Sequence, residues 1–123
     1  MMGGSHMPLV SIVMPVYNGA TWLRPCLDSI LRQTMDDFEL IVVDDASTDE
    51  TPGILADYAS RDVRMTVATH GRNTHAGTAR NDGMKRATGT YLLFLDADDL
   101  YEPRLLERAV GCAQTGDADV VLF

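Results

Sequence analysis

The sequence lacks the features that mark several large classes of protein. It contains no GxGxxG and no Walker A motif, so the phosphate cradles of dinucleotide dehydrogenases and P-loop enzymes are missing. No apolar run is long enough to cross a bilayer, and there is no secretory signal pattern. The three histidines show no spacing typical of metal ligands, and no Ser–His–Asp or Cys–His arrangement is apparent. We therefore expect a cytoplasmic protein with no transmembrane segment in this chain.

Basic residues and cysteines are also scarce. Ten Lys and Arg stand against 18 Asp and Glu, and the net charge of −8 argues against a nucleic-acid or anionic membrane surface. Cys26 and Cys112 fall at apolar positions of expected helices, which predicts buried thiols rather than a disulfide. Residues 1–7 (MMGGSHM) look like an expression-tag remnant, so His6 carries no functional weight. Residues 8–123 are long enough for one domain.

Apolar runs alternate with amphipathic stretches along the chain. Strands are predicted at 9–16, 38–43, 64–68, 91–95 and 119–123. The first helix is predicted to follow an N-cap at Thr21, with Pro25 in its first turn, and to end near residue 34. The other helices are predicted after a capping box of Ser47 and Glu50, over about 79–87 with Gly89 at its end, and from Glu102 onward. This alternation predicts an α/β fold with a doubly wound, mostly parallel, Rossmann-like sheet.

Carboxylates follow two of the predicted strands directly. Asp96, Asp98 and Asp99 come after the run at 91–95, and Asp44 and Asp45 come after the run at 38–43. Because the carboxyl ends of parallel strands open on one edge, both groups are expected to line one crevice. Crowded carboxylates suit Mg²⁺ or Mn²⁺, with water and substrate phosphates as the remaining ligands. The alternative is that Asp99 caps the next helix, that the other two acids are solvated, and that Asp44 or Asp45 caps the helix at Ser47.

Other candidates lie near the same edge. Tyr17, just after the first strand, is placed to stack on a flat base, or else is a half-buried turn aromatic. Arg80, with Asn81, is expected near a helix start, where it would pair with a diphosphate or remain a solvated surface residue. His70 and His75 are interpreted as ordinary loop histidines.

Three stretches carry a resemblance to a known family: VSIVMPVYNGATWLRPCLDSILRQT, FELIVVDDASTDET and ARNDGMKRATGTYLLFLDADD. They resemble the inverting GT-A glycosyltransferases of family 2, from about Val10 to the last residue. The strand–Pro–x–Tyr–Asn pattern, the DD followed by Ser, Thr and Asp, and the DxD occur in that order. One departure concerns the polar loop: Asn73 is followed by Thr74 and His75, where the family commonly has a Gly.

The resemblance implies a nucleotide-sugar donor, usually UDP-linked, with Mg²⁺ or Mn²⁺ on its diphosphate. The sugar would pass with inversion to a hydroxyl of an unknown saccharide or lipid acceptor, in the cytoplasm or at the cytoplasmic face of the membrane. Asp98 would coordinate the metal with support from Asp96. Asp45, with Asp44 as the alternative, would accept a hydrogen bond from the base. The donor-binding residues implied are Pro15, Val16, Tyr17, Asn18, Asp44, Asp45, Arg80 and Asp96.

Family members continue well past this length, so the chain is expected to be the nucleotide-sugar-binding part of such an enzyme. No catalytic residue is assigned within it, because the general base is expected beyond residue 123. The chain alone would then be inactive in transfer, and its truncated sheet would favour self-association. Two alternatives stay open, a non-catalytic nucleotide-binding domain and a phospho-accepting receiver domain. A receiver carries its acids after the first and third strands and a Lys after a late strand, whereas here the acids follow the second and fourth and the only Lys is Lys85.

Overall fold

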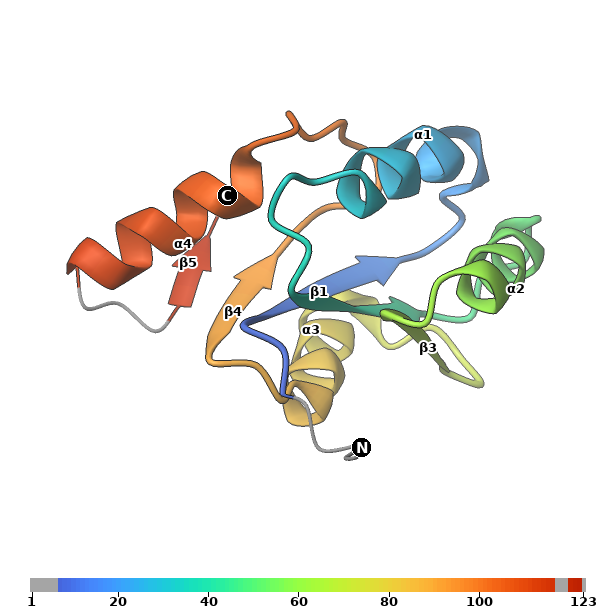
Figure 1. The fold of residues 1–123 in the computed structure, drawn as a ribbon. Helices are drawn as coiled ribbons and strands as arrows, with labels where there is room; N and C mark the ends of the chain where they lie inside the picture. Colours follow the sequence, from blue (N-terminus) through green and yellow to red (C-terminus); the bar gives the residue numbers. More distant parts are fainter. Residues whose placement is uncertain (1–6, 117–119, 123) are drawn as a thin grey trace, which may run out of the picture.

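The computed structural model describes residues 7–116 and 120–122, and strands and helices alternate throughout this part (Figure 1). The alternation confirms the predicted α/β class. The elements in chain order are β1 (Val10–Val16), α1 (Ala20–Leu31), β2 (Phe38–Asp44), α2 (Thr51–Arg61), β3 (Met65–Thr69), α3 (His75–Arg86), β4 (Tyr91–Phe94), α4 (Leu105–Gly116) and β5 (Val120–Leu122).

All five strands form one parallel sheet in the order β3-β2-β1-β4-β5. Val10 at the start of β1 pairs with Phe38 of β2 on one side and with Tyr91 of β4 on the other. The chain winds outward through β2 and β3 and then returns to the opposite side of β1. The winding direction therefore reverses between β1 and β4, and α/β sheets bind ligands in the crevice at such a switch point.

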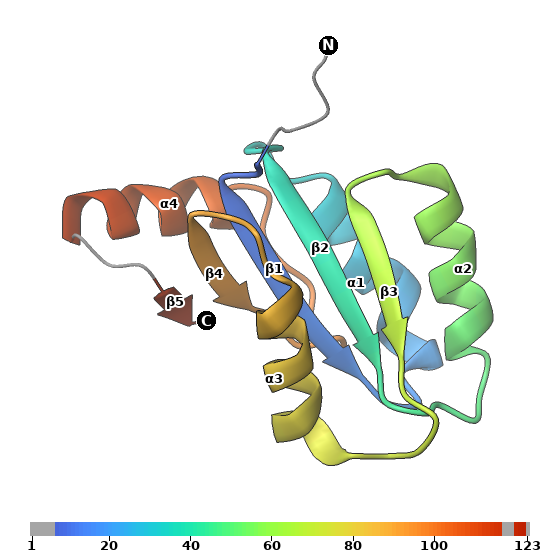
Figure 2. The ribbon, with the colours of Figure 1, turned by 90° about the horizontal axis from the view of Figure 1, so that it is seen from below.

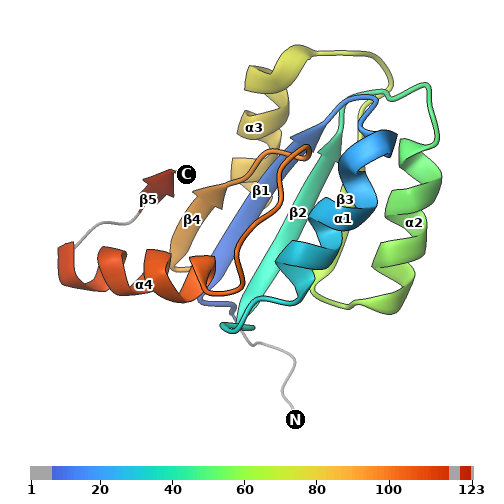
Figure 3. The ribbon, with the colours of Figure 1, turned by 90° about the horizontal axis from the view of Figure 1, so that it is seen from above.

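Helices cover both faces of the sheet, as Figures 2 and 3 show. Helices α1, α2 and α4 lie on one face, and α3 lies on the other. Alternate residues of β1 point to opposite faces, and Ile12 and Met14 belong to the larger core with Leu27 of α1. On the other face α3 packs close to β1. The two elements are so near at Gly83 that an added Cβ would lie 2.3 Å from a methyl carbon of Val13.

Helix α1 begins two residues earlier than predicted. The carbonyl oxygen of Gly19 accepts the N–H groups of Trp22 and Leu23, at 3.1 and 3.0 Å, which places the N-cap at Gly19. Thr21 is therefore not the cap, and Pro25 lies inside the helix rather than in its first turn. A proline inside a helix removes one hydrogen bond, and burial of the apolar stripe offsets that loss. The stripe consists of Leu23, Cys26, Leu27 and Ile30.

The starts of the other helices also differ from the prediction, and for α2 a tertiary contact occupies the expected cap. The Ser47 hydroxyl accepts the N–H of Asn18 at 2.9 Å instead of capping a helix, and α2 begins at Thr51. Helix α3 begins at residue 75 rather than 79, and α4 begins at residue 105 rather than 102. Gly89 lies beyond the C-cap of α3, and its N–H donates to the Ser11 hydroxyl at 2.7 Å.

Both cysteines lie on helices as predicted, but only Cys26 is buried, and Cys112 is exposed. The predicted last strand is present over its central residues, with residues 119 and 123 outside the described part. Within the described residues no helix has the length and apolarity that a membrane span requires.

Candidate functional site

A pocket of about 520 Å³ opens at the carboxyl edge of the sheet, where β1 and β4 diverge. Its walls come from the end of β1 and the turn after it, one residue of α1, the segment after β4, one residue after β2 and one residue of α3. Every residue predicted from the sequence to bind donor or metal lines this pocket except Asp44. The lining residues are Pro15, Val16, Tyr17, Asn18, Gly19, Trp22, Asp45, Arg80, Asp96, Ala97 and Asp98.

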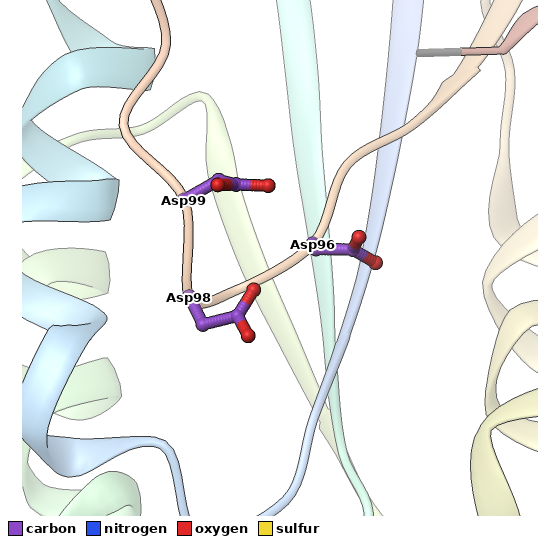
Figure 4. Close-up of side chains that lie close together, drawn as sticks. All are labelled: Asp96, Asp98 and Asp99. Carbon is purple, nitrogen blue, oxygen red and sulfur yellow. The ribbon is translucent and has the colours of Figure 1, made fainter.

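Three carboxylates gather just beyond β4 (Figure 4). Asp96, Asp98 and Asp99 each offer an oxygen, and these oxygens lie within 4.8 Å of one another. All three residues are exposed, and Asp99 does not cap α4, which begins at Leu105. Like charges so close repel one another unless a cation lies among them. Carboxylate oxygens are the ligands that Mg²⁺ and Mn²⁺ prefer.

The backbone that carries these acids is fixed to α1. The Asp96 carbonyl oxygen accepts the Tyr101 hydroxyl at 2.7 Å and the Cys26 thiol at 3.5 Å, and the Tyr101 N–H donates to the Ser29 hydroxyl at 3.1 Å. Burial raises the pKa of the Cys26 thiol to about 12 and also raises the pKa of Tyr101, so both groups stay protonated and able to donate. The acidic segment therefore has a fixed path while its carboxylates remain open to a ligand.

The next turn of the chain is fixed in the same way. Buried Gln33, near the end of α1, donates its amide to the Glu102 carbonyl at 2.7 Å and accepts the Leu106 N–H at 3.0 Å. One side chain thus satisfies polar backbone groups on both sides of the α4 start. The segment between β4 and α4 is held along its length.

Two aromatic side chains at the pocket are unusually open to solvent. Tyr17 is 50% exposed and Trp22 is 58% exposed. Exposed rings in a pocket suit stacking against a flat or partly apolar ring of a ligand. Tyr17 was predicted from the sequence, whereas Trp22 was not. The available signal for Trp22 was its position on α1 outside the apolar stripe, because packing in the core does not explain a tryptophan there.

The turn after β1 is tied to the loop after β2. Asn18 has a positive φ of 50°, a conformation that asparagine tolerates. Its side-chain oxygen accepts the N–H groups of Thr48 and Asp49, at 2.7 and 3.3 Å. The Gly19 N–H donates to the Thr51 hydroxyl at 3.0 Å. Asn18 therefore shapes the pocket wall through its oxygen.

The two acids after β2 have different surroundings. Asp44 is buried, does not line the pocket, and accepts the Ser47 N–H at 3.1 Å, but it caps no helix there, because α2 begins at Thr51. Asp45 is also buried but reaches the pocket. One of its oxygens, Oδ1, accepts the N–H of Thr74 at 2.9 Å, the hydroxyl of Thr74 at 2.6 Å and the ring Nδ1–H of His70 at 2.9 Å. Burial raises the pKa of the Asp45 carboxyl, but the bonds from Thr74 and His70 outweigh it and hold the pKa below 3.8.

His70 is a part of the site that the sequence interpretation missed. Its Nε2 lies 2.9 Å from a carboxylate oxygen of Asp82 on α3, while its Nδ1 faces Asp45. The hydrogen bonds with Asp45 and Asp82 raise the pKa of His70 above 6.5. The available signal was position: His70 directly follows β3, at the same edge of the sheet as the acids.

Arg80 lies in the interior of α3, so the prediction that a helix N-terminus assists it is wrong. Its guanidinium nonetheless lines the pocket, 3.8 Å from an Asp96 carboxylate oxygen. Both side chains are exposed, and such a pair adds little to stability. The positive group is therefore available to an anion in the pocket.

Solved structures of glycosyltransferases share this fold. S. aureus TarS in complex with UDP-GlcNAc is 31% identical over 87% of this chain and 31% of its own, with a TM-score of 0.80. The mannosyltransferase PcManGT from Pyrobaculum calidifontis, in complex with GDP-Man and Mn²⁺, is 32% identical over 89% of this chain and 33% of its own, also at 0.80. The GT-A type of fold is thereby confirmed.

Sequence comparison also relates this chain to glycosyltransferases. The uncharacterized glycosyltransferase EpsJ of Bacillus subtilis (strain 168) is 42% identical over 114 residues, which make up 93% of this chain and 33% of that protein. This chain thus spans about a third of the length of such relatives. A sequence model described as glycosyl transferase family 2 matches residues 11–123, which excludes the receiver-domain alternative. The chain belongs to glycosyl transferase family 2.

Proposed function

We propose that this chain binds a nucleoside-diphosphate sugar, with UDP as the nucleotide, in the pocket at the carboxyl ends of β1 and β4. The observation that carries the proposal is the composition of this one pocket. It combines an exposed aromatic ring at Tyr17, a buried ionised acceptor at Asp45, a cation at Arg80 and a carboxylate pair at Asp96 and Asp98. The solved relatives in complex with UDP-GlcNAc and with GDP-Man support it.

The base would lie against the walls formed after β1 and β2. Tyr17 offers its exposed ring for stacking, and Pro15 and Val16 line the same wall. Asp45 would accept a hydrogen bond from an N–H of the base, because an ionised carboxylate has no proton to donate. The diphosphate would then lie toward Arg80 and the acids that follow β4.

The acids after β4 fit a divalent cation, Mg²⁺ or Mn²⁺, by the chemistry of their donor atoms. Asp98 would hold it together with Asp96, and the diphosphate would complete its ligands. When bound, such an ion neutralises charge on a departing nucleoside diphosphate. The chain's own residues would hold the segment 96–104 in place through the contacts of Tyr101 and Gln33 with α1.

In the whole protein we propose that the bound sugar passes to a hydroxyl of a saccharide or lipid with inversion at the anomeric carbon. Inversion requires a base that takes the proton of the attacking hydroxyl. We assign that base to a part of the protein outside this chain, since relatives are about three times as long. A non-catalytic nucleotide-binding role is the alternative, and transfer by the whole protein would exclude it.

Titration calorimetry tests the proposal. Mn²⁺ should bind weakly alone and at least about tenfold more tightly in the presence of UDP, because two or three carboxylates leave the shell of the ion incomplete. Asp98→Asn should remove this enhancement without lowering the melting temperature, since it relieves repulsion among the acids. Asp57→Asn, which removes an exposed carboxylate on α2, is the charge-matched control and should behave as the wild type. Equal Mn²⁺ affinity with and without UDP would contradict the proposal.

A further inference from the structure

Two carboxylates from different elements converge on one partly buried imidazole. His70 Nδ1 lies 2.9 Å from Asp45 Oδ1, and Nε2 lies 2.9 Å from Asp82 Oδ2 on α3. The His70 backbone N–H donates to the Asp44 carbonyl at 2.9 Å, which fixes the residue beside β2. Asp45 lines the pocket and Asp82 does not. The imidazole therefore links the pocket to a helix residue outside it.

Carboxylates at hydrogen-bond distance from both ring nitrogens favour a charged ring. A neutral imidazole has one N–H, so it cannot donate to carboxylates at both nitrogens, whereas an imidazolium can. The charged groups that face it are Asp45 after β2 and Asp82 on α3, and the Thr74 hydroxyl lies 3.0 Å from Nδ1. Arg86, which pairs with the other oxygen of Asp82 at 3.0 Å, is the nearest further cation in this network.

This arrangement determines what Asp45 can offer a ligand. The three bonds from Thr74 and His70 all reach Oδ1, and the His75 N–H also faces the carboxylate, so Oδ2 is the oxygen with the fewer bonds from the protein. A carboxylate that is kept ionised accepts hydrogen bonds and donates none. It favours a base whose edge carries a ring N–H, as uracil N3 does, and disfavours cytosine, which presents a lone pair at that position.

We propose that His70, held by Asp82, is a positioning residue that orients Asp45 and thereby sets the preference of the pocket for a base with a ring N–H. The inference rests on the proposed function, because it assigns Asp45 to the base end of the donor. His70 and Asp82 act through Asp45 and do not touch the nucleotide themselves. Loss of either should weaken base discrimination and leave the metal end of the pocket as it was.

The test compares UDP and CDP binding, each with and without Mn²⁺, in the wild type, His70→Gln and Asp82→Asn. The wild type should prefer UDP, and His70→Gln should reduce the UDP-to-CDP affinity ratio by about tenfold, the value of a hydrogen bond to a charged group. Asp82→Asn should reduce the ratio in the same direction although it lies outside the pocket. The enhancement of UDP binding by Mn²⁺ should stay within about twofold of the wild type in both variants. Asp57→Asn is the control.

Magnetic resonance of the His70 ring provides a readout without nucleotide. In the wild type the ring should show two N–H protons and titrate above its ordinary pKa, and Asp82→Asn should lower the titration midpoint. An unchanged UDP-to-CDP ratio in both variants would overturn the inference, as would a neutral His70 at pH 6. If the UDP-to-CDP affinity ratio and the enhancement of UDP binding by Mn²⁺ fell together, the inference would also be overturned, because such a result indicates disruption of the whole pocket. Wild-type protein that binds neither nucleotide would instead contradict the proposed function, and the inference with it.

Discussion

Three non-glycine residues of the described chain have positive φ angles, and all belong to segments at the carboxyl edge of the sheet. They are Asn18 at 50°, Ala46 at 67° and His75 at 72°. The conformation suits asparagine, but it costs most other residues about 1–2 kcal/mol. His75 carries a Cβ in a conformation that glycine would adopt without strain.

Replacing His75 by glycine should therefore stabilise the protein. The imidazole is exposed, and the hydrogen bonds described for the residue are made by its backbone N–H, to Asn73 at 2.9 Å and to Asp45, and the variant keeps both. We expect the free energy of unfolding to rise by about 0.5–1 kcal/mol in a urea titration. His75→Ala is the matched control, because it removes the ring but keeps the Cβ that causes the strain, and it should give no gain. A loss of stability in the glycine variant would contradict the strain argument.

The His70 network predicts a pH-dependent contribution to stability. Because the folded pKa of His70 is raised above 6.5, its contribution is fully present below pH 6.5 and is lost as the pH rises through the folded value. The pKa values of Asp45 and Asp82 are lowered below 3.8, so their contributions are lost only as the pH falls through those values. The difference in unfolding free energy between wild type and His70→Gln should be largest near about pH 5 and smaller near about pH 9. A difference that stays constant between these values would rule out the charged network.

At the scale of elements, one glycine of α3 and one of α2 are expected to have opposite effects on stability when replaced by alanine. A Cβ at Gly83 of α3 would lie 2.3 Å from a Val13 methyl carbon on β1, whereas a Cβ at Gly53 of α2 would meet nothing within 4 Å. Gly83→Ala should lower the free energy of unfolding by about 1–3 kcal/mol, because α3 or the sheet must shift. Gly53→Ala should raise it by up to about 1 kcal/mol through helix propensity. Thermal unfolding of both variants checks the pair, and equal effects would show that α3 does not pack as closely as described.

The positions of strands and helices could be predicted where a local sequence pattern determines them. Strands β1 and β2 are apolar runs buried by helices on both faces, so their positions follow from the sequence alone. The start of α2 was missed because the contact that occupies its expected cap is long-range. Ser47 has the sequence of a cap, but its hydroxyl serves Asn18, and Gly89 is required by the approach of Ser11 rather than by a helix end.

At the scale of the whole molecule, the rule that ligands bind at the carboxyl edge of the strands brought most pocket residues together before any coordinates. It applied to Asp45 and Asp98 because each follows a strong strand pattern. It was not applied to His70, since β3 is short and contains two threonines, so its end was less clear from the sequence. Asp44 and Asp45 are adjacent and chemically identical, so only the fold could show which one reaches the pocket.

Because the general base is assigned to a part of the protein outside this chain, the chain is predicted to bind nucleotide without transferring sugar. The chain should bind UDP in the presence of Mn²⁺ yet transfer no sugar to an acceptor, because transfer needs a base within hydrogen-bond reach of the acceptor hydroxyl and a surface that orients it. Incubation with radiolabelled UDP-sugars, scored for hydrolysis and for transfer to a panel of acceptors, checks this. Robust transfer would place the base within this chain, whereas a chain that transfers nothing but binds UDP agrees with the assignment.

The order of the strands also has a consequence for synthesis on the ribosome. Strands β1, β2 and β3 are neighbours both in sequence and in the sheet, so they can pair as soon as they emerge, whereas β4 must return across them to the free side of β1. Until then β1 presents an unpaired edge, and the nascent chain has no binding pocket, because Asp96 and Asp98 have not yet arrived. Nucleotide can thus act as a folding ligand only after residue 98 has emerged. A chaperone or ribosome-bound factor that shields the edge of β1 would be needed before that point and not after it.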